Sequence, residues 1–243
     1  MTHDDYIAAL RGNATAAADA ARAAGMEARV PSCPEWTVRD LAAHLGGHHR
    51  WVTGNLGRAP EDGMHPIGAY EPAPEGPAAA DWIEEGAAAL ADRLAEAGPD
   101  QRCWTWVPER STSGFWARRT ANETAVHRWD LQNAAGAPES FDADHAADAI
   151  DEYFGVMQVI GSERLRGDSE TIHWHCTDTD GEWLVRLAPD GLEVSREHAK
   201  ADVAMRGPAS DLLLVTIGRA PASTIEVLGD AALVERWQAG AKF

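Results

Sequence analysis

The chain has 243 residues, with 39 acidic against 21 basic side chains and a formal net charge of −18 at pH 7. This length suffices for one large domain or two smaller ones. The acidic surplus argues against a phosphate backbone or an anionic membrane surface as a partner, because both are bound through clustered Lys and Arg. We therefore expect no nucleic acid and no membrane among the partners.

Other bulk features favour a cytoplasmic protein. The N-terminal segment lacks the apolar core of a signal peptide, and the most apolar run, Asp211–Gly218, is far shorter than a membrane span of about 18 residues. Cys33, Cys103 and Cys176 are odd in number and widely spaced, which argues against a disulfide framework. We expect a monomer or homodimer that acts on small molecules.

The N-terminal part of the chain is predicted to be helical, because apolar residues recur at helical spacing among many alanines. Thr37 is the predicted N-cap of the second helix, with Asp40 three residues on, close to a capping box. A loop rich in Gly and Pro, Gly54–Pro77, follows this helix. The other predicted helices span Asp4–Ala24, Ala79–Ala97, Phe115–Ala135 and Asp142–Ile160.

After Gly167 the pattern changes to short β-prone runs. Thr171–Cys176 and Trp183–Leu187 flank Asp178–Gly181, which is typical of a β-hairpin. Further strands are predicted at Leu192–Ser195, Ala201–Arg206 and Ile225–Leu228, and helices at Pro208–Ile217 and Asp230–Gln238. The predicted fold class is α+β, with a helical bundle at 1–162 and a small α+β domain at 168–243.

The fourth predicted helix carries a candidate metal-binding pair. Glu123 and His127 are four residues apart, so their side chains lie on one face of the helix. His44, on the second helix, is the natural third ligand, and three protein ligands leave a position open, as catalytic zinc sites require. The same spacing also occurs in ordinary solvated Glu–His pairs. Neighbouring Trp116 and Trp129 favour a buried helix, where such a pair needs a partner.

Two long segments carry a family resemblance. Val30–Trp51, with the sequence VPSCPEWTVRDLAAHLGGHHRW, and Phe115–Asp130, with FWARRTANETAVHRWD, resemble mycothiol-dependent maleylpyruvate isomerase-like proteins, relatives of the DinB-like bundle enzymes. Ala201–Arg219 and Val227–Asp230 resemble the C-terminal domain of that family. The resemblance implies a DinB-like bundle of four or five helices followed by a sterol-carrier-like α+β domain.

The resemblance also implies a site and a chemistry. It places zinc, or another divalent metal, on His44, Glu123 and His127, and it places a catalytic arginine at Arg219, where a guanidinium fork suits a substrate carboxylate. The implied cofactor is the low-molecular-weight thiol mycothiol, whose pKa the metal would lower. Its thiolate would add to the double bond of a small electrophilic acid such as maleylpyruvate and be eliminated after rotation, or stay attached in a transferase.

Several other residues can be interpreted as structural or as functional. His48 and His49 are interpreted as residues near the site and not as ligands, and Cys33 as an apolar residue packed beside Trp36. Asp130 is a candidate partner for the second ring nitrogen of His127. His173 and His175 share one face of a predicted strand and so resemble part of a second metal site, but the sequence shows no third metal ligand for them. Most of the ten tryptophans are expected in the core.

Two alternatives to a thiol-dependent isomerase or transferase stay open. The same metal can activate water, which would make the chain a hydrolase of a small amide or ester. A non-catalytic protein that binds a small molecule, with the metal structural or absent, is the other. Activity without any thiol would favour hydrolysis, and a metal site without an exchangeable water would favour the binding protein.

Overall fold

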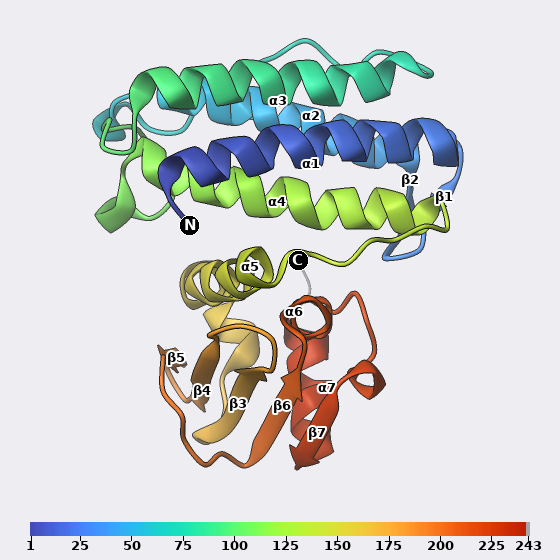
Figure 1. The fold of residues 1–243 in the computed structure, drawn as a ribbon. Helices are drawn as coiled ribbons and strands as arrows, with labels where there is room; N and C mark the ends of the chain where they lie inside the picture. Colours follow the sequence, from blue (N-terminus) through green and yellow to red (C-terminus); the bar gives the residue numbers. More distant parts are fainter. Residues whose placement is uncertain (242–243) are drawn as a thin grey trace. The chain divides into compact units, whose positions relative to one another are not determined.

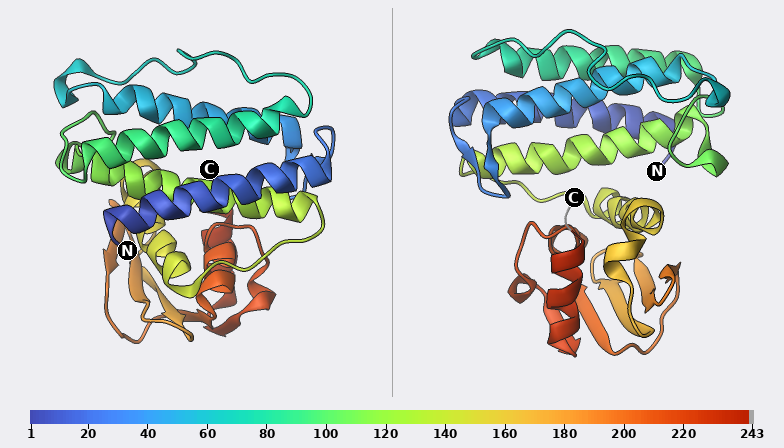
Figure 2. Two further views of the ribbon diagram at one scale, coloured as in Figure 1. Left: turned by 45° about the horizontal axis from the view of Figure 1, so that its top comes forward. Right: turned by 180° about the vertical axis from the view of Figure 1, so that it is seen from behind.

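The computed structural model describes residues 1–241 and divides into two compact units, Met1–Glu139 and Ser140–Phe243. The first unit is helical, and its long helices lie side by side in both sets of views (Figures 1 and 2). They are α1 (His3–Ala24), α2 (Val38–Leu56), α3 (Ala78–Ala97) and α4 (Ser113–Ala134). Short 3-10 helices occur at Pro60–Asp62 and Pro108–Arg110.

Local signals explain where these helices begin and end. Thr37 and Asp40 form the predicted capping box at the start of α2, and Thr2 and Asp5 form another at the start of α1. Gly98 follows α3 with a φ of 64°, which glycine adopts without steric cost. A short hairpin of β1 (Arg29–Val30) and β2 (Cys33–Thr37) precedes α2.

Apolar stripes on the helices build the core of the first unit. Leu10, Leu41, Leu45, Ile83, Leu90 and Trp116 are among its completely buried side chains. Such positions recur every three or four residues along α1, α2 and α3, so one face of each of these helices is apolar. Helix α4 is buried on most of its faces. Removing each of these side chains from water contributes about 1.5–3 kcal/mol to stability. This packing also brings α2 and α4 together, and those helices carry the candidate metal ligands.

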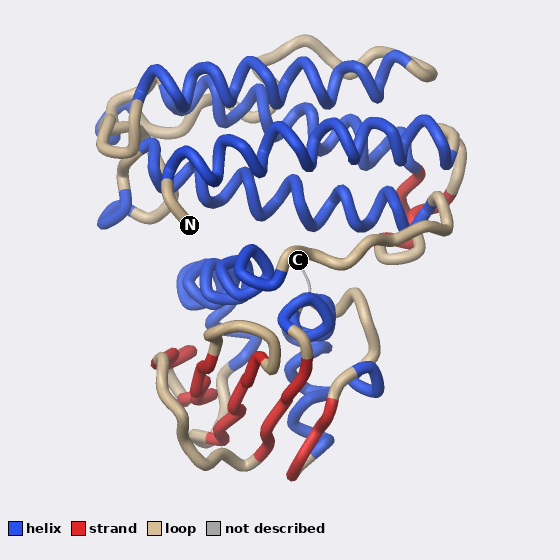
Figure 3. The backbone as a smooth tube through the Cα atoms, in the orientation of Figure 1, coloured by secondary structure: helices blue, strands red, loops and turns tan. Residues whose placement is uncertain are grey.

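The second unit is an α+β domain built on a five-stranded sheet, as far as residues 1–241 describe it (Figure 3). Its strands are β3 (Glu170–Cys176), β4 (Glu182–Ala188), β5 (Gly191–Ser195), β6 (Val203–Gly207) and β7 (Glu226–Gly229), in the order β5-β4-β3-β6-β7. Only the pair β3–β6 is parallel among these described strands. The helices are α5 (Ala143–Val156), α6 (Ala209–Thr216) and α7 (Ala231–Gly240), with a short π-helix at Met157–Gly161 and short 3-10 helices at Ser162–Leu165 and Ala222–Thr224.

One face of this sheet packs on helices through aromatic side chains. The rings of Trp174 on β3 and Trp237 on α7 have centroids 4.8 Å apart, and Phe154 on α5 contacts both. Trp183 on β4 faces Phe154 at 6.0 Å. Because alternate residues of a strand point to opposite faces, the neighbours of these tryptophans point to the other face of the sheet.

The boundary between the units differs from the one that the sequence predicted between residues 162 and 168. Helix α5 groups with the sheet and not with the bundle. The physical reason is its apolar face, where Phe154 packs against the tryptophans of β3, β4 and α7. The helical character of α5 was predicted correctly, but helical periodicity does not say which core a helix joins.

The fold class predicted from the sequence, a helical bundle followed by an α+β domain, is confirmed. Among the described residues, no helix combines the length and apolar character needed to cross a membrane.

Candidate metal centre

Three side chains from α2 and α4 converge on one point in the first unit. The Nε2 atoms of His44 and His127 each lie 3.2 Å from Oε1 of Glu123. The ring centroids of the two histidines are 5.0 Å apart, and the three ligand atoms lie within 4.8 Å of one another. The arrangement follows from the four-residue spacing on α4 and from the packing of α2 beside it. The structure therefore brings together all three residues that the sequence proposed as ligands.

The environment of these side chains is graded from buried to accessible. The side chain of His127 is 9% exposed, that of Glu123 16% and that of His44 38%. Burial alone would raise the pKa of Glu123, but Arg119 and the two histidines outweigh it and hold that pKa well below its usual value. Burial would lower the pKa of His127, but its bonds to Asp130 and Glu123 raise it to about 9. The buried carboxylate thus stays charged, with Arg119 and the protonated ring of His127 as its cationic partners. A metal ion bound by the group would take the place of the proton on Nε2 of His127.

Asp130 orients the ring of His127. Its Oδ2 lies 2.9 Å from Nδ1 of His127, and its Oδ1 accepts a hydrogen bond from the hydroxyl of Ser32. Asp130 is completely buried. A carboxylate on Nδ1 leaves Nε2 of the same ring directed at Glu123, which is how metal-binding histidines are commonly held. This is the geometry that the three-residue spacing of His127 and Asp130 predicted.

Arg119 is a residue of the site that the sequence analysis did not identify. Its guanidinium forms an ion pair with Oε2 of Glu123, while both histidines approach Oε1. The two carboxylate oxygens therefore serve different partners. Arg119 lies four residues before Glu123, so the helical spacing that identified His127 also predicts this contact.

The histidines that follow His44 lie close to the site but outside the ligand group. His48 is half-buried, and burial lowers its pKa to about 3. His49 is completely buried, and its Nε2 lies 2.9 Å from the hydroxyl of Thr124. Both rings are therefore neutral at pH 7. Neither belongs to the group of three side chains whose ligand atoms converge, His44, Glu123 and His127.

Cys33 and several tryptophans are partly buried and lie against the core of the first unit. Cys33 and Trp36 both pack against the hydrophobic core of the first unit, and the Trp36 ring also lies 5.1 Å from that of His44. Trp51, Trp104, Trp106 and Trp116 form one aromatic cluster with ring centroids 4.9–6.3 Å apart. This cluster holds α2, α4 and the loop before α4 together.

Arg219 lies in the second unit, in the turn that follows α6. Gly218 has a φ of 71°, and the backbone N–H of Arg219 donates to the carbonyl oxygen of Leu214 at 2.7 Å. The catalytic role of Arg219 stays a prediction that rests on the resemblance.

Two protein-family models match the chain over most of its length. The mycothiol maleylpyruvate isomerase N-terminal domain matches residues 3–132, and the MDMPI C-terminal domain matches residues 144–236. The chain belongs to the mycothiol maleylpyruvate isomerase family. This confirms the resemblance on which part of the sequence analysis depended.

Comparison with solved structures agrees with this family. The chain is similar to the crystal structure of a mutant of the mycothiol-dependent maleylpyruvate isomerase, with 12% identity, a TM-score of 0.66 and coverage of 93% of both chains. At this identity the likeness shows that the two proteins share a fold. No curated protein matches the chain.

Two further solved structures match only weakly. A UbiJ-SCP2 ubiquinone synthesis protein matches at 16% identity over 38% of this chain and 91% of its own, with a TM-score of 0.32. A double mutant of a sec-alkyl sulfatase matches at 13% identity over 54% of this chain and 24% of its own, with a TM-score of 0.35.

Proposed function

We propose that this member of the family binds one divalent metal ion, zinc, through His44, Glu123 and His127 and uses a low-molecular-weight thiol, mycothiol, as its nucleophilic cofactor. Its reaction is the cis-trans isomerisation of a small electrophilic acid such as maleylpyruvate, or thiol transfer to such a compound. The observation that carries the proposal is the convergence of two imidazole Nε2 atoms on one buried carboxylate oxygen.

The donor set fits zinc. Two imidazoles and one carboxylate are common zinc ligands, and three protein ligands leave a fourth position for a further ligand. Zinc bound there would lower the pKa of a coordinating thiol, so that the thiol is present as the nucleophilic thiolate at neutral pH.

The chain's own residues then have separate tasks. Asp130 accepts a hydrogen bond from Nδ1–H of His127, so that Nε2 is the ring nitrogen left to bind a metal. Arg119 holds Oε2 of Glu123, which fixes the carboxylate while Oε1 faces the histidines. Arg219, at the position that the resemblance gives to a catalytic arginine, is proposed to bind a carboxylate of the substrate.

The experiment begins with metal content. Protein purified without a histidine tag is compared with His44→Ala, Glu123→Ala and His127→Ala, and His3→Ala, whose ring contacts the Leu94 carbonyl, is the control outside the site. We expect each ligand variant, but not the control, to lose one zinc per chain while its circular dichroism is unchanged. Zinc content that is the same in all variants would contradict the assigned ligands.

The second stage measures thiol dependence. Purified, zinc-loaded protein is given maleylpyruvate with and without mycothiol, and isomer and thioether products are separated by chromatography. We expect turnover only with the thiol, and loss of turnover in the three ligand variants. Hydrolysis of a small ester or amide without any thiol would favour the hydrolase, because the position that a thiol would take can equally hold water. An intact zinc site without turnover of either kind would favour a binding protein.

A further inference from the structure

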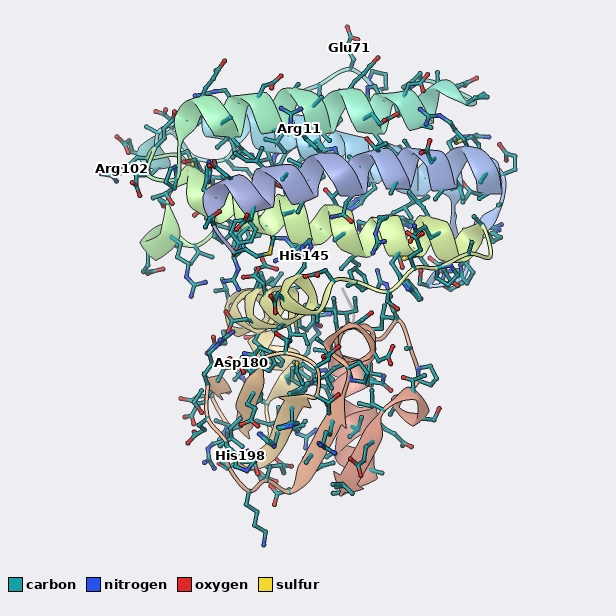
Figure 4. The ribbon with its side chains drawn as sticks, viewed as in Figure 1. Arg11, Glu71, Arg102, His145, Asp180 and His198 are labelled. Carbon is teal, nitrogen blue, oxygen red and sulfur yellow. The ribbon has the colours of Figure 1, made fainter. Side chains whose placement is uncertain are left out.

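A second group of potential metal ligands lies on the sheet of the second unit. It consists of His173 and His175 on β3, Glu182 on β4, and His198 on the segment between β5 and β6. Figure 4 labels His198 on this connecting segment. The sequence indicated only the two histidines of β3. Glu182 is brought to them by the pairing of β3 with β4, and His198 by the path of the segment between β5 and β6.

Strand register explains how the group forms. His175 and Glu182 are directly opposite in the antiparallel pair of β3 and β4, so their side chains are neighbours on one face. His173 lies two residues before His175 and points to the same face. Ile172 and Trp174 alternate with them and are completely buried on the opposite, helix-covered face.

The ligand atoms of the group converge on Glu182. Nδ1 of His198 lies 3.1 Å from each oxygen of this carboxylate, and Nδ1 of His175 contacts Oε1. The ring centroid of His173 lies 5.4 Å from that of His198 and 6.1 Å from that of His175. One ligand atom from each of the four residues lies within 4.8 Å of the others.

An ion pair between Glu182 and its neighbouring histidines explains part of this arrangement, but it leaves His173 unexplained. The residue is only 6% exposed, and its Nε2 is buried without a hydrogen-bond partner among the described residues. A buried polar atom is nearly always paired, and an unpaired one needs a physical reason. A metal ion held among the three rings and the carboxylate would supply the missing partner.

We propose that His173, His175, Glu182 and His198 form a second metal site, which binds one divalent transition metal ion of the zinc class. Imidazole nitrogens select zinc, copper or nickel over calcium and magnesium, which prefer oxygen ligands. Tetrahedral zinc with bonds of about 2.0–2.1 Å places its ligand atoms about 3.3 Å apart. Small side-chain rotations that move the ligand atoms by about an ångström would therefore bring the four residues to this geometry. Four protein ligands leave no open position, which makes this a structural site.

The site would fix an otherwise irregular segment. Residues 196–202 connect β5 to β6 without helix or strand, and His198 is exposed. Coordination of His198 would hold this segment against β3 and β4. The proposal is independent of the function assigned to the first unit, because the two ligand groups share no residue and lie in different units.

The test counts zinc in the full-length chain with the first site removed. His44→Ala/His127→Ala protein without a tag is stripped with a chelator and titrated with zinc against a chromophoric competitor. We expect one zinc per chain in this background and two in the wild type. Adding His198→Ala to this background should lower the affinity for the remaining zinc ion at least tenfold. Adding His175→Ala instead should abolish zinc binding. Glu197→Gln, which removes an exposed carboxylate from the same segment, is the matched control and should change nothing.

Cobalt gives a second readout, because tetrahedral Co²⁺ has intense visible absorption bands that octahedral Co²⁺ lacks. We expect these bands in the His44→Ala/His127→Ala background and their loss with His198→Ala, whose exposed position makes misfolding an unsuitable explanation. Hydrogen exchange in residues 196–202 should slow when zinc is added. The proposal is overturned if this background binds no zinc, or if its zinc survives His175→Ala and His198→Ala unchanged. If only the proposed first site is wrong, the His44→Ala/His127→Ala protein would still bind one zinc ion per chain.

Discussion

Asp130 shows how one buried residue can control a metal site without touching the metal. It lies between the Ser32 hydroxyl and Nδ1 of His127, completely buried. Replacing it with Asn keeps the size of the side chain but removes the charge that fixes the ring and raises its basicity. We expect Asp130→Asn to weaken zinc binding at the first site about 10–100-fold.

The measurement for Asp130→Asn is a zinc titration against a chelator of known affinity. It is carried out in a His175→Ala background, in which the second site is expected to bind no zinc, so that only the first site is counted. Ser32→Ala, which removes a neutral partner of the same carboxylate, should have a smaller effect. Equal zinc affinity in the Asp130→Asn variant and its parent would show that Asp130 does not position His127.

His49 gives the first unit a defined sensitivity to acid. Burial lowers its pKa to about 3, whereas an unfolded histidine titrates near 6.5. A group whose pKa is lower in the folded state contributes its full stability above pH 6.5 and loses it as the pH falls toward 3. Between pH 7 and pH 5 this residue should therefore reduce the free energy of unfolding by about 2 kcal/mol.

The His49 prediction is checked by urea unfolding of metal-free protein at pH 7 and pH 5. The wild type is compared with His49→Asn, which keeps a polar group beside Thr124 but does not titrate. The difference in stability between the two proteins should shrink by about 2 kcal/mol on going to pH 5. A difference that does not depend on pH would mean that His49 is not neutral in the folded state.

At the scale of single residues, the sequence predicted which side chains come together where their spacing on one helix decides it. Glu123, His127 and Asp130 follow from positions on one helix, and His44 was supplied by its motif and the adjacent helix. Arg119 was within reach of the same reasoning but was not recognised. The group around Glu182 was not predictable, because it depends on strand register and on a segment that returns to the sheet.

Between elements, the contact of α2 with α3 depends on glycine. A Cβ atom at Gly46 would lie 2.4 Å from Cε3 of Trp82 on α3, whereas one at Gly12, exposed in α1, would meet nothing within 4 Å. We expect Gly46→Ala to destabilise the protein by about 1–3 kcal/mol, because the tryptophan or the helix must move. Gly12→Ala should instead stabilise by about 0.5–1 kcal/mol, because alanine favours helix.

Chemical denaturation of the two glycine variants and the wild type gives these differences directly. The same substitution is made in two helices, so helix propensity is matched and the change in sign isolates the packing of Trp82. A stabilised Gly46→Ala protein would show that α2 and α3 adjust to the extra methyl group without strain.

The long elements were predictable because periodicity and end signals agreed in each of them. The capping box at Thr37 and the end of α3 at Ala97 lie where the sequence placed them. The hairpin of β1 and β2 was not predicted, since Pro31 and Pro34 indicate a turn and β1 has only two residues. Strand pairs this short leave no alternation to detect.

For the whole molecule, the division into units was the least predictable feature of the fold. Helix α5 has the same apolar periodicity as the helices of the bundle, yet it belongs to the core of the second unit. Aromatic residues far along the chain, Trp174, Trp183 and Trp237, decide this by offering a surface to Phe154. A local pattern contains no information about such distant partners.

This division predicts that residues 1–139 fold and bind metal alone. The unit ends at Glu139 and contains the proposed ligands His44, Glu123 and His127 together with Asp130. A chain of this length buries enough apolar surface to be stable. We expect the isolated segment to be helical by circular dichroism and to bind one zinc with the affinity of the first site in the full chain. Retained zinc with loss of thiol-dependent turnover would assign a part in the reaction to the second unit, where Arg219 lies. An unfolded or metal-free segment would show that the second unit is needed to form the site.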